Sequence, residues 1–482
     1  MLRHIAINYS KMMHYTGTYT DHYQLSMAQA YFLQGKQEDT AVFDYFFRKL
    51  PFNGGYAIFA GLADILPILE NLGFDAAEIE YLGQQGFDPL FLDYLRNFRF
   101  KGNVYACSEG ELVFPLCPML SVEANIIEAQ LIETLLLNLL NFQTLIATKA
   151  SRMRAVAGES QLIEFGLRRA QGPGGYYASR AAIIGGFNAT SNVCAGRDYQ
   201  IRTAGTMAHS FVQSYEDELS AFRSFALIWP EHCVLLVDTY DTLKSGLPNA
   251  IKVAKEMEAR GQQLQGIRLD SGDLAYLSKA ARNLLDQAGL KYVKITASNQ
   301  LDEYVIRSLK EQQASIDVFG VGTHLVTGAP DCALDGVYKL AAVNNTPRIK
   351  LSETFSKTTF PAKKQVYRVL DNYGSFLGLD VIALMHEQDL KHIHHPFDPL
   401  KSCTIKEYQK EPLLHKVMAA GKSLLEVKNL EEISRYRQER LALLPEEYKR
   451  FENPHLYKVS LSTKLKEARD HLIQHYKSSN ET

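Results

Sequence analysis

Short apolar runs recur between about residues 160 and 345, and each run is followed by polar residues or glycines. From Val234 onward the runs begin 33, 26 and 23 residues apart, which is the spacing of repeated strand–helix units and implies parallel strands. The runs are apolar throughout, so we expect both faces of the sheet to be buried. Because polar residues end so many of them, a barrel with its active site at the carboxyl ends of the strands is favoured over an open sheet. The predicted strands are Leu162–Phe165, Val234–Val237, Ile267–Leu269, Val293–Thr296 and Ile316–Phe319.

Three segments between these strands fit amphipathic helices, because apolar side chains recur in them at helical spacing. The first covers residues 250–257 and ends near Gly261; the second covers residues 274–288 and ends at Gly289. A glycine just past the last turn is typical of a helix end. The third predicted helix places one apolar face on Leu301, Tyr304, Val305 and Leu309.

The length of 482 residues predicts two or three domains. Residues 1–120 alternate helix and strand signals and predict an N-terminal α/β domain, and residues 121–345 contain the predicted barrel. Residues 346–482 form a more basic C-terminal region, with a charged helical stretch over 430–476. No glycine- and serine-rich linker separates these parts, so we expect the C-terminal region to pack on the N-terminal domain and the barrel.

Composition excludes several classes of protein. The formal net charge of −2 argues against a dedicated nucleic-acid binder. The six cysteines form no CxxC pair and have no histidine at zinc-finger spacing, so we interpret them as buried thiols of a reducing compartment. Residues 1–19 lack the apolar stretch of a signal peptide, and the most apolar helix candidate, 126–146, is too polar to span a bilayer. The expected location is therefore the cytoplasm, with no membrane partner.

The segment Gly205–Phe211 brings His209 together with the hydroxyls of Thr206 and Ser210. A lone histidine is more often a satisfied core residue than a functional one. Here it is accompanied by the strand-end motifs of the same region, so these three side chains are candidates for a functional site.

Arg268 and Asp270 leave one predicted strand two residues apart, and strand alternation points them to the same side. A guanidinium suits a planar carboxylate or a phosphate, because its donors form a fork. The alternative is a buried ion pair between the two residues. Asp273, three residues further on, is either a site residue or the cap of the next helix.

Two further strand ends carry candidates. Gly320, Gly322 and Thr323 follow one predicted strand, and glycines there allow backbone amides to approach a phosphate closely. Asp238 follows the strand Val234–Val237 and is another candidate.

Taken together, these motifs resemble those of the nicotinate phosphoribosyltransferases, a family of type II phosphoribosyltransferases. The similar segments occur in order through nearly the whole chain: Thr20–Met27, Phe165–Ala170, Gly205–Phe211, Arg268–Asp273, Gly320–Thr323, Val337–Leu340, Lys364–Arg368 and Leu443–Arg450.

The resemblance implies an irregular TIM-like α/β barrel, an N-terminal sandwich-like α/β domain and a C-terminal extension. It implies a homodimer whose active sites are shared between subunits. The implied reaction joins nicotinate to 5-phosphoribosyl 1-diphosphate, giving nicotinate mononucleotide and diphosphate in NAD salvage. ATP is the implied co-substrate, hydrolysed through a phosphohistidine, and Mg²⁺ is the implied cofactor.

The resemblance also assigns roles at the reacting end of the site. His209 matches the histidine that ATP phosphorylates, and an oriented imidazole is a competent phosphoryl acceptor. Arg268 matches a nicotinate-binding arginine, while Asp270 faces the ribose, the metal or both, and Asp273 is a second metal candidate. Thr206 and Ser210 could donate to substrate or phosphate.

At the other parts of the implied site, Arg168 matches an arginine at the pyridine end, with its neighbour Arg169 as the rival. Tyr23 matches a tyrosine that stacks on nicotinate in the partner subunit's site. Gly320, Gly322 and Thr323 match the site for the ribose 5-phosphate.

The chain departs from related sequences at two places, and the first of them bears on specificity. Residues 188–192 carry no acid, whereas the related nicotinamide enzyme has an aspartate near the place of Ser191; its absence suits a carboxylate ligand. Ala362 stands where the family usually has glycine. The alternatives left open are a nicotinamide or quinolinate phosphoribosyltransferase and a barrel that binds a nucleotide without catalysis. The run Asp238–Thr242 superficially resembles a type I phosphoribosyltransferase motif, but it lacks the adjacent acids and the glycine-rich turn.

Overall fold

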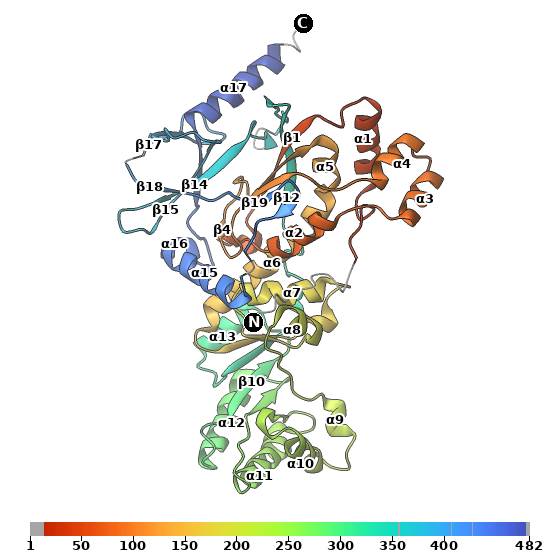
Figure 1. Ribbon diagram of the computed structural model, residues 1–482. Helices are drawn as coiled ribbons and strands as arrows, with labels where there is room; N and C mark the ends of the chain where they lie inside the picture. The colour runs from red at the N-terminus through yellow and green to blue at the C-terminus, as the bar shows by residue number, and fades with distance from the viewer. Residues whose placement is uncertain (1–13, 355–356, 406, 427, 479–482) are drawn as a thin grey trace, which may run out of the picture. The chain divides into compact units, whose positions relative to one another are not determined.

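The computed structural model describes residues 14–354, 357–405, 407–426 and 428–478, and it has a mixed α/β fold (Figure 1). Its contacts divide the chain into two compact units. One unit combines Met1–Thr148 with Ala333–Thr482, and the other is Lys149–Cys332. The sequence-based boundaries at residues 120 and 345 differ from those of the two units, because residues 120–125 and 336–343, at the two ends of the predicted barrel, pair with a strand of the N-terminal segment.

An antiparallel seven-stranded sheet combines N-terminal and C-terminal segments of the chain in the first unit. At its centre, β1 (Thr40–Phe47) pairs with β5 (Leu120–Asn125) on one side and with β12 (Gly336–Val343) on the other. β1 is buried along almost its whole length, which explains its run of aromatic residues. The remaining strands are β3 (Asn103–Ala106), β13 (Thr346–Pro347), β19 (His415–Ala419) and β20 (Lys422–Ser423).

The N-terminal segment adds helices and one short strand pair to this unit. The predicted helix over residues 126–146 is present as two helices that meet at Ile132. Residues 126–132 are entirely buried, so this segment is part of the core, as expected. The elements are α1 (His22–Leu33), α2 (Leu62–Asn71), α3 (Ala76–Gln84), α4 (Pro89–Arg96), α5 (Ile126–Leu131), α6 (Glu133–Ala157), β2 (Ala57–Ile58) and β4 (Leu112–Val113).

A six-stranded sheet occupies the C-terminal region, and one of its strands corrects the sequence analysis. The predicted helical stretch over 430–476 is interrupted by β21 (Lys458–Ser462), which pairs with β15 (Phe376–Leu384). Only five residues long and beginning with a lysine, β21 has too little apolar pattern to be recognised in a charged region. The other elements are β14 (Lys364–Leu370), β16 (His392–His394), β17 (Ser402–Thr404), β18 (Gln409–Pro412), α15 (Leu430–Leu443), α16 (Glu446–Lys449) and α17 (Thr463–Ser478).

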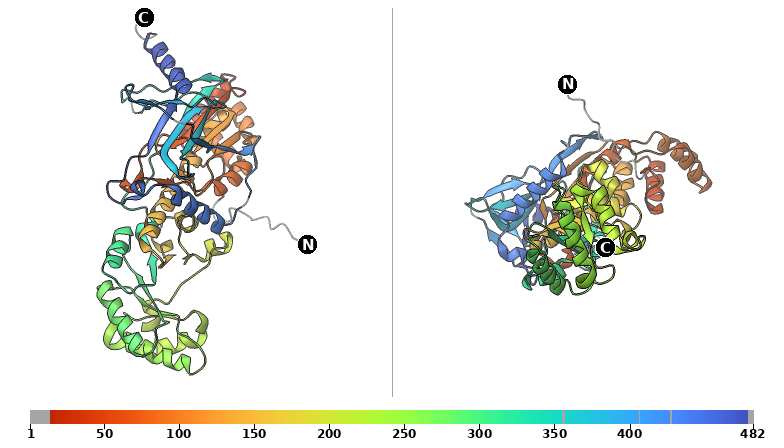
Figure 2. Two further views of the ribbon diagram at one scale, coloured as in Figure 1. Left: turned by 90° about the vertical axis from the view of Figure 1, so that its left-hand side faces the viewer. Right: turned by 90° about the horizontal axis from the view of Figure 1, so that it is seen from below.

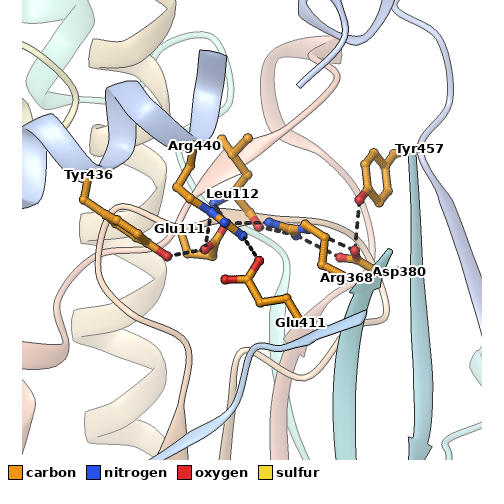
Figure 3. A network of polar contacts seen from close by, with 8 residues as sticks. All are labelled: Glu111, Leu112, Arg368, Asp380, Glu411, Tyr436, Arg440 and Tyr457. Atoms are coloured by element: carbon orange, nitrogen blue, oxygen red, sulfur yellow. Dashed lines mark hydrogen bonds and ion pairs between the residues drawn. The ribbon is translucent and has the colours of Figure 1, made fainter. Parts of the chain in front are cut away.

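A buried charge network connects these N- and C-terminal elements within the first unit (Figure 3). Arg368 on β14 has no exposed surface and binds Asp380 through two hydrogen bonds of 3.0 and 2.9 Å. Its third nitrogen contacts Glu111, which Arg440 of α15 also binds at 2.8 Å. Burial works to raise the pKa of Glu111, but the charges of Arg368 and Arg440 outweigh it and hold that pKa below its usual range.

The second unit contains the predicted parallel sheet, in the order β7-β6-β11-β10-β9-β8. All five strands expected from the sequence are present, and every pairing is parallel. The added strand is β7, whose two residues are too short for a pattern. The strands are β6 (Gln161–Glu164), β7 (Ala189–Thr190), β8 (Val234–Leu236), β9 (Gly266–Leu269), β10 (Lys294–Ser298) and β11 (Val318–Val321).

Closure of this sheet into a barrel is not found among the described strands. β7 and β8 are its two ends, and the backbone around Thr203 extends the β7 side by an isolated parallel bridge to Thr190. Helices flank the sheet in the views of Figure 1 and Figure 2. They are α7 (Gly174–Ile184), α8 (Val193–Tyr199), α9 (His209–Gln213), α10 (Glu218–Ile228), α11 (Leu247–Glu258), α12 (Leu274–Gln287), α13 (Glu303–Glu311) and α14 (Thr323–Val326).

The predicted helix face is correct for α11, whereas the face predicted for α13 is correct at Leu309 and at Leu301, just before the helix, and wrong at Tyr304 and Val305. In α11 the side chains predicted to face the core, residues 250, 253, 254 and 257, are buried. In α13, Tyr304 and Val305 are exposed, whereas Ile306, Leu309 and Glu303 point inward. The reason is electrostatic as well as apolar, because the buried Glu303 binds Lys149 at 2.6 Å.

All six cysteines are free; three of them are buried, and Cys332 and Cys403 are exposed, contrary to the expectation of buried thiols.

Within the described ranges, no helix combines the length and the apolar character needed to cross a membrane.

Candidate functional site

A pocket in the second unit lies where the parallel strands end and their loops begin. Eight of the residues singled out in the sequence line it together, although they come from four separate segments of the chain. They are Arg168, Thr206, His209, Arg268, Asp270, Gly320, Gly322 and Thr323.

Arg268 is held in the pocket by one contact at each guanidinium nitrogen. Nε donates to Ser298 Oγ at 2.8 Å, Nη1 to Thr206 Oγ1 at 3.0 Å and Nη2 to Asp270 Oδ1 at 2.8 Å. The guanidinium also lies over the ring of Phe165, with 5.5 Å between its carbon and the ring centroid. Its side chain keeps 13% of its surface exposed, so the pair with Asp270 is not a sealed core ion pair.

Asp270 is the acidic side chain among the described residues that line the pocket. Burial works to raise its pKa, but the hydrogen bond from Ser298 and the charge of Arg268 outweigh that effect and hold the pKa below its usual range. The carboxylate is therefore ionised at neutral pH. Its Oδ2 atom lies 3.8 Å from Nε2 of His209.

His209 begins the short helix α9, and its side chain is 41% exposed. Nδ1 lies 3.1 Å from Thr239 Oγ1, so that hydroxyl fixes the ring on the side away from Asp270. In the tautomer in which Nδ1 donates to Thr239, Nε2 carries the lone pair and faces the pocket carboxylate.

Four predicted site residues are outside the pocket lining. Asp238 accepts a hydrogen bond from the backbone amide of Asp270 at 2.8 Å and so helps to position Asp270 without lining the pocket. Asp273 caps α12 by accepting from Tyr276 N at 3.0 Å, which is the alternative that the sequence left open. Ser210 is exposed on α9, and Tyr23 lies on α1 of the first unit with its side chain half exposed.

Arg168 and Arg169 both line the pocket from the short turn that follows β6, and both are exposed. The geometry therefore leaves both as candidates for the same role. Ser191 lines the pocket as well, and it brings no negative charge to that side.

The glycines at the end of β11 are needed for packing. A Cβ atom at Gly320 would lie 2.5 Å from the ring of Phe165, and one at Gly322 would lie 3.2 Å from the carbonyl oxygen of Phe165. Larger residues would push away the segment that carries Arg168. Thr323 follows directly, exposed at the start of α14.

Three residues that contact the candidates were missed in the sequence. Ser298 receives a hydrogen bond from Arg268 and donates one to Asp270, Thr239 holds His209, and Phe165 packs against Arg268. Ser298 ends β10, two residues beyond the predicted end of that strand. The rule that polar residues at strand ends form the site would have found it if the strand had been drawn to its full length.

The arrangement combines a fixed cation, an ionised carboxylate and an accessible imidazole in one pocket. Among the described residues, no three His, Cys, Asp or Glu side chains cluster closely enough to hold a metal ion by themselves. A cation bound here would need ligands from a substrate, as Mg²⁺ commonly takes from phosphates.

Models of one family match almost the whole chain in three parts. The nicotinate phosphoribosyltransferase (NAPRTase) N-terminal domain matches residues 18–141, the NAPRTase family model matches residues 160–377, and the nicotinate phosphoribosyltransferase C-terminal domain matches residues 363–469.

Individual relatives agree with these matches. The chain is 45% identical to the nicotinate phosphoribosyltransferase of Bacillus subtilis over 92% of both chains. It is 36% identical to the enzyme of the same name from Caenorhabditis elegans, over 92% of this chain and 91% of that protein. The crystal structure of human nicotinic acid phosphoribosyltransferase superposes with a TM-score of 0.85 and 33% identity, covering 94% of this chain and 99% of that one.

Proposed function

The chain belongs to the nicotinate phosphoribosyltransferase family, and we propose that its pocket joins nicotinate to 5-phosphoribosyl 1-diphosphate in NAD salvage. The products are nicotinate mononucleotide and diphosphate. The proposal rests on how Arg268 is held. Each of its three guanidinium nitrogens donates to a different partner, and one of these partners is the ionised carboxylate of Asp270. A guanidinium fixed in this way can receive the planar carboxylate of nicotinate without losing its orientation.

The pocket charge supports nicotinate as the pyridine. Arg168, Arg169 and Arg268 line it, whereas Asp270 is the one acidic residue in the described lining. A neutral amide in place of the carboxylate would lose a charge-assisted hydrogen bond worth about 1.5–3 kcal/mol. Quinolinate carries a second carboxylate, and the test below includes it because three arginines could serve two acids.

The ribose and its phosphates are assigned to the opposite parts of the pocket. Displacement of diphosphate builds positive charge at the sugar and negative charge on the leaving group. We assign Asp270 to the ribose and the backbone from Gly320 to Thr323 to the 5-phosphate, because these residues line the pocket at different strand ends. Thr206 and Ser210 are proposed donors to substrate or phosphate; Thr206 contacts Arg268 and lines the pocket, which supports its role more strongly.

ATP assistance through His209 is part of the same proposal. The Nε2 lone pair would attack the γ-phosphorus of ATP, forming a P–N bond while the bond to the ADP oxygen breaks. The exposure of the ring and its fixed Nδ1 contact with Thr239 support this role.

Residues of the pocket fit Mg²⁺ only together with substrate phosphates. Asp270 is ionised, and one oxygen of the nearby Asp238 is buried without a hydrogen-bond partner in the described part of the chain. Mg²⁺ is usually held by one or two carboxylates with phosphate oxygens, and there it would neutralise the leaving diphosphate. Asp270 is the proposed ligand; Asp273 is a weaker one, because its carboxylate already caps α12.

The assembly and location are also proposed. We assign Tyr23 to the site of a second subunit in a homodimer, where its half-exposed ring would stack on nicotinate. The six-stranded parallel sheet is assigned to an irregular, incompletely closed barrel, and six free thiols suit a cytoplasmic enzyme.

One assay tests the reaction. Purified protein is incubated with 5-phosphoribosyl 1-diphosphate and radiolabelled nicotinate, nicotinamide or quinolinate, each with and without ATP and Mg²⁺. We expect nicotinate mononucleotide to form, with ATP increasing the yield and omission of Mg²⁺ reducing it. Equal kcat/KM for nicotinate and either competitor would reject the assigned substrate.

A second assay tests the phosphohistidine. Labelled ATP should give the protein an acid-labile, base-stable phosphate, and His209→Ala should lose it while a slow ATP-independent reaction remains. Label that persists in the variant would move the acceptor to another residue.

A further inference from the structure

Glu164 is a buried carboxylate directly beneath the pocket. It is the last residue of β6 and has no exposed surface. It does not line the pocket itself, but the next residue, Phe165, does. Its position is therefore one layer below the residues that meet a ligand.

Three neutral groups from different parts of the chain donate to this carboxylate. Oε1 accepts from the backbone amide of Gly166, while Oε2 accepts from Thr190 Oγ1 at 2.5 Å and from Ser179 Oγ at 2.9 Å. Burial raises the pKa of Glu164, and these three hydrogen bonds oppose that effect. All three groups donate to the same side chain, so the carboxylate of Glu164 is the common acceptor of the cluster.

Two of the donors, Gly166 and Thr190, adjoin loops that carry the pocket wall, while Ser179 lies on α7. Gly166 starts the turn that presents Arg168 and Arg169. Thr190 directly precedes Ser191, whose backbone amide also donates to Glu164 O at 2.8 Å.

Thr190 also connects to a third loop. The backbone amide of Thr190 donates to Arg202 O at 3.1 Å, and its carbonyl oxygen accepts from Ala204 N at 2.9 Å. The segment Gly205–His209 of the pocket wall follows immediately. One carboxylate thus ties together the loop of the two arginines, the loop of Ser191 and the approach to Thr206.

We propose that Glu164 is a positioning residue for the pyridine end of the pocket, fixing the turn that carries Arg168 and Arg169 against the Ser191 loop. It acts through these loops and touches no reacting atom. The inference rests on the proposed function, because it takes nicotinate to be the ligand at that end. Without this acceptor the turn would be less firmly held, and the two arginines could move away from the pyridine carboxylate.

The test separates the two substrates. In Glu164→Ala the Gly166 amide loses its acceptor, and we expect the KM for nicotinate to rise about tenfold or more, with the KM for 5-phosphoribosyl 1-diphosphate changed less than about twofold. Glu164→Gln keeps an oxygen that accepts from the Gly166 amide, and its NH2 group can donate to the hydroxyl oxygens of Thr190 and Ser179. It should therefore recover most of the nicotinate affinity.

Two further variants keep the test decisive. Thr190→Val removes one donor without changing the shape and should raise the nicotinate KM in the same direction by about threefold; it decides the matter if Glu164→Ala does not fold. Glu303→Gln is the matched control, because Glu303 is equally buried in the same unit but sits on α13. It should lower the thermal midpoint and leave both KM values unchanged.

The outcomes distinguish the two levels of the proposal. Wild-type protein that does not convert nicotinate rejects the proposed function. Wild-type conversion with equal changes in both KM values, or with a lower thermal midpoint alone, rejects the positioning role and leaves Glu164 as part of the core.

Discussion

Two arginines in this chain make similar bonds to carboxylates in different surroundings. Arg368, in the first unit, binds Asp380 at 2.9 and 3.0 Å and has no exposed surface. Arg268, in the second unit, binds Asp270 at 2.8 Å, and the two side chains keep 13% and 25% of their surface exposed. The bonds themselves do not distinguish the two pairs; the exposure and the location do.

The difference indicates which pair a ligand can reach. The guanidinium of Arg368 donates to Glu111, Asp380 and a backbone carbonyl. Aromatic rings cover it, and the centroid of the Phe376 ring lies 4.6 Å from its central carbon. No ligand can reach such a group, so its role is in the stability and uniqueness of the fold. Arg268 stands at a strand end beside an open pocket, where each bond orients the guanidinium without enclosing it.

The largest effect should follow from breaking the buried pair. In Arg368→Met the carboxylate of Asp380 stays buried without its cation and Glu111 keeps only Arg440, which costs about 3–5 kcal/mol of unfolding free energy. Denaturant unfolding measures the loss. Arg223→Met is the control, because Arg223 binds Glu256 at 2.6 Å with 45% of its side chain exposed, and its loss should lower the free energy of unfolding far less, since solvent screens the pair. Equal losses in the two variants would contradict the assigned structural role.

Breaking the open pair should instead affect catalysis. In Arg268→Met we expect kcat/KM for nicotinate to fall about 10- to 150-fold, which corresponds to about 1.5–3 kcal/mol of lost charge-assisted binding. The value for nicotinamide should change little, so discrimination between the two pyridines should largely disappear. A fall that is the same for both would show that Arg268 acts elsewhere than on the carboxylate.

The same measurement resolves the question of Arg168 and Arg169. Methionine at each position in turn should reduce nicotinate discrimination at one of them only, if a single arginine meets the pyridine. Both variants should unfold within about 0.5 kcal/mol of the wild type, because the two side chains are exposed.

The effect of pH should sharpen the comparison further. The folded-state pKa of Asp270 is lowered, so its contribution to stability is present above the unfolded-state value of about 3.9 and is lost as the pH falls through the lower folded-state pKa. Ser298→Ala removes one of the causes and should raise that pKa. The acid limb of the kcat/KM profile should then move to higher pH, with kcat/KM at neutral pH reduced about fivefold for a loss of about 1 kcal/mol. An acid limb that stays in place would mean that Asp270 is not the group titrating in it.

The sequence predicted the second unit better than the first, for a physical reason. Parallel strands followed by helices repeat a local pattern, so β8 to β11 and the buried face of α11 could be read from neighbouring residues. In the first unit the decisive pairing of β1 with β12 joins residues about 300 positions apart. Nothing local to either strand specifies that partner.

The candidate site was predicted to the extent that charge or glycine marked it. Arg268, Asp270 and His209 stood at strand ends or beside them, and the structure brings them together. Ser298 and Thr239 were missed because a neutral hydroxyl is common at any position. Asp238 and Asp273 could not be separated from site residues by sequence, because their backbone partners exist only in the folded loops.

The smallest expected effect concerns the hydroxyl that holds His209. Thr239→Val keeps the shape of the side chain and removes the oxygen that lies 3.1 Å from Nδ1. A neutral hydrogen bond of this kind contributes about 0.5–1.5 kcal/mol, so the rate of phosphorylation by ATP should fall about threefold as the ring loses one fixed orientation. The ATP-independent reaction should be unchanged, because Arg268 and Asp270 do not contact Thr239 in the hydrogen bonds of the described residues. Rapid-quench measurement of the labelled protein distinguishes these rates, and Thr242→Val, at the start of the short helical segment Thr242–Gly246, is the control. Equal slowing of both reactions would place Thr239 in the structure of the pocket as a whole, whereas slowing of phosphorylation alone would assign it to the histidine.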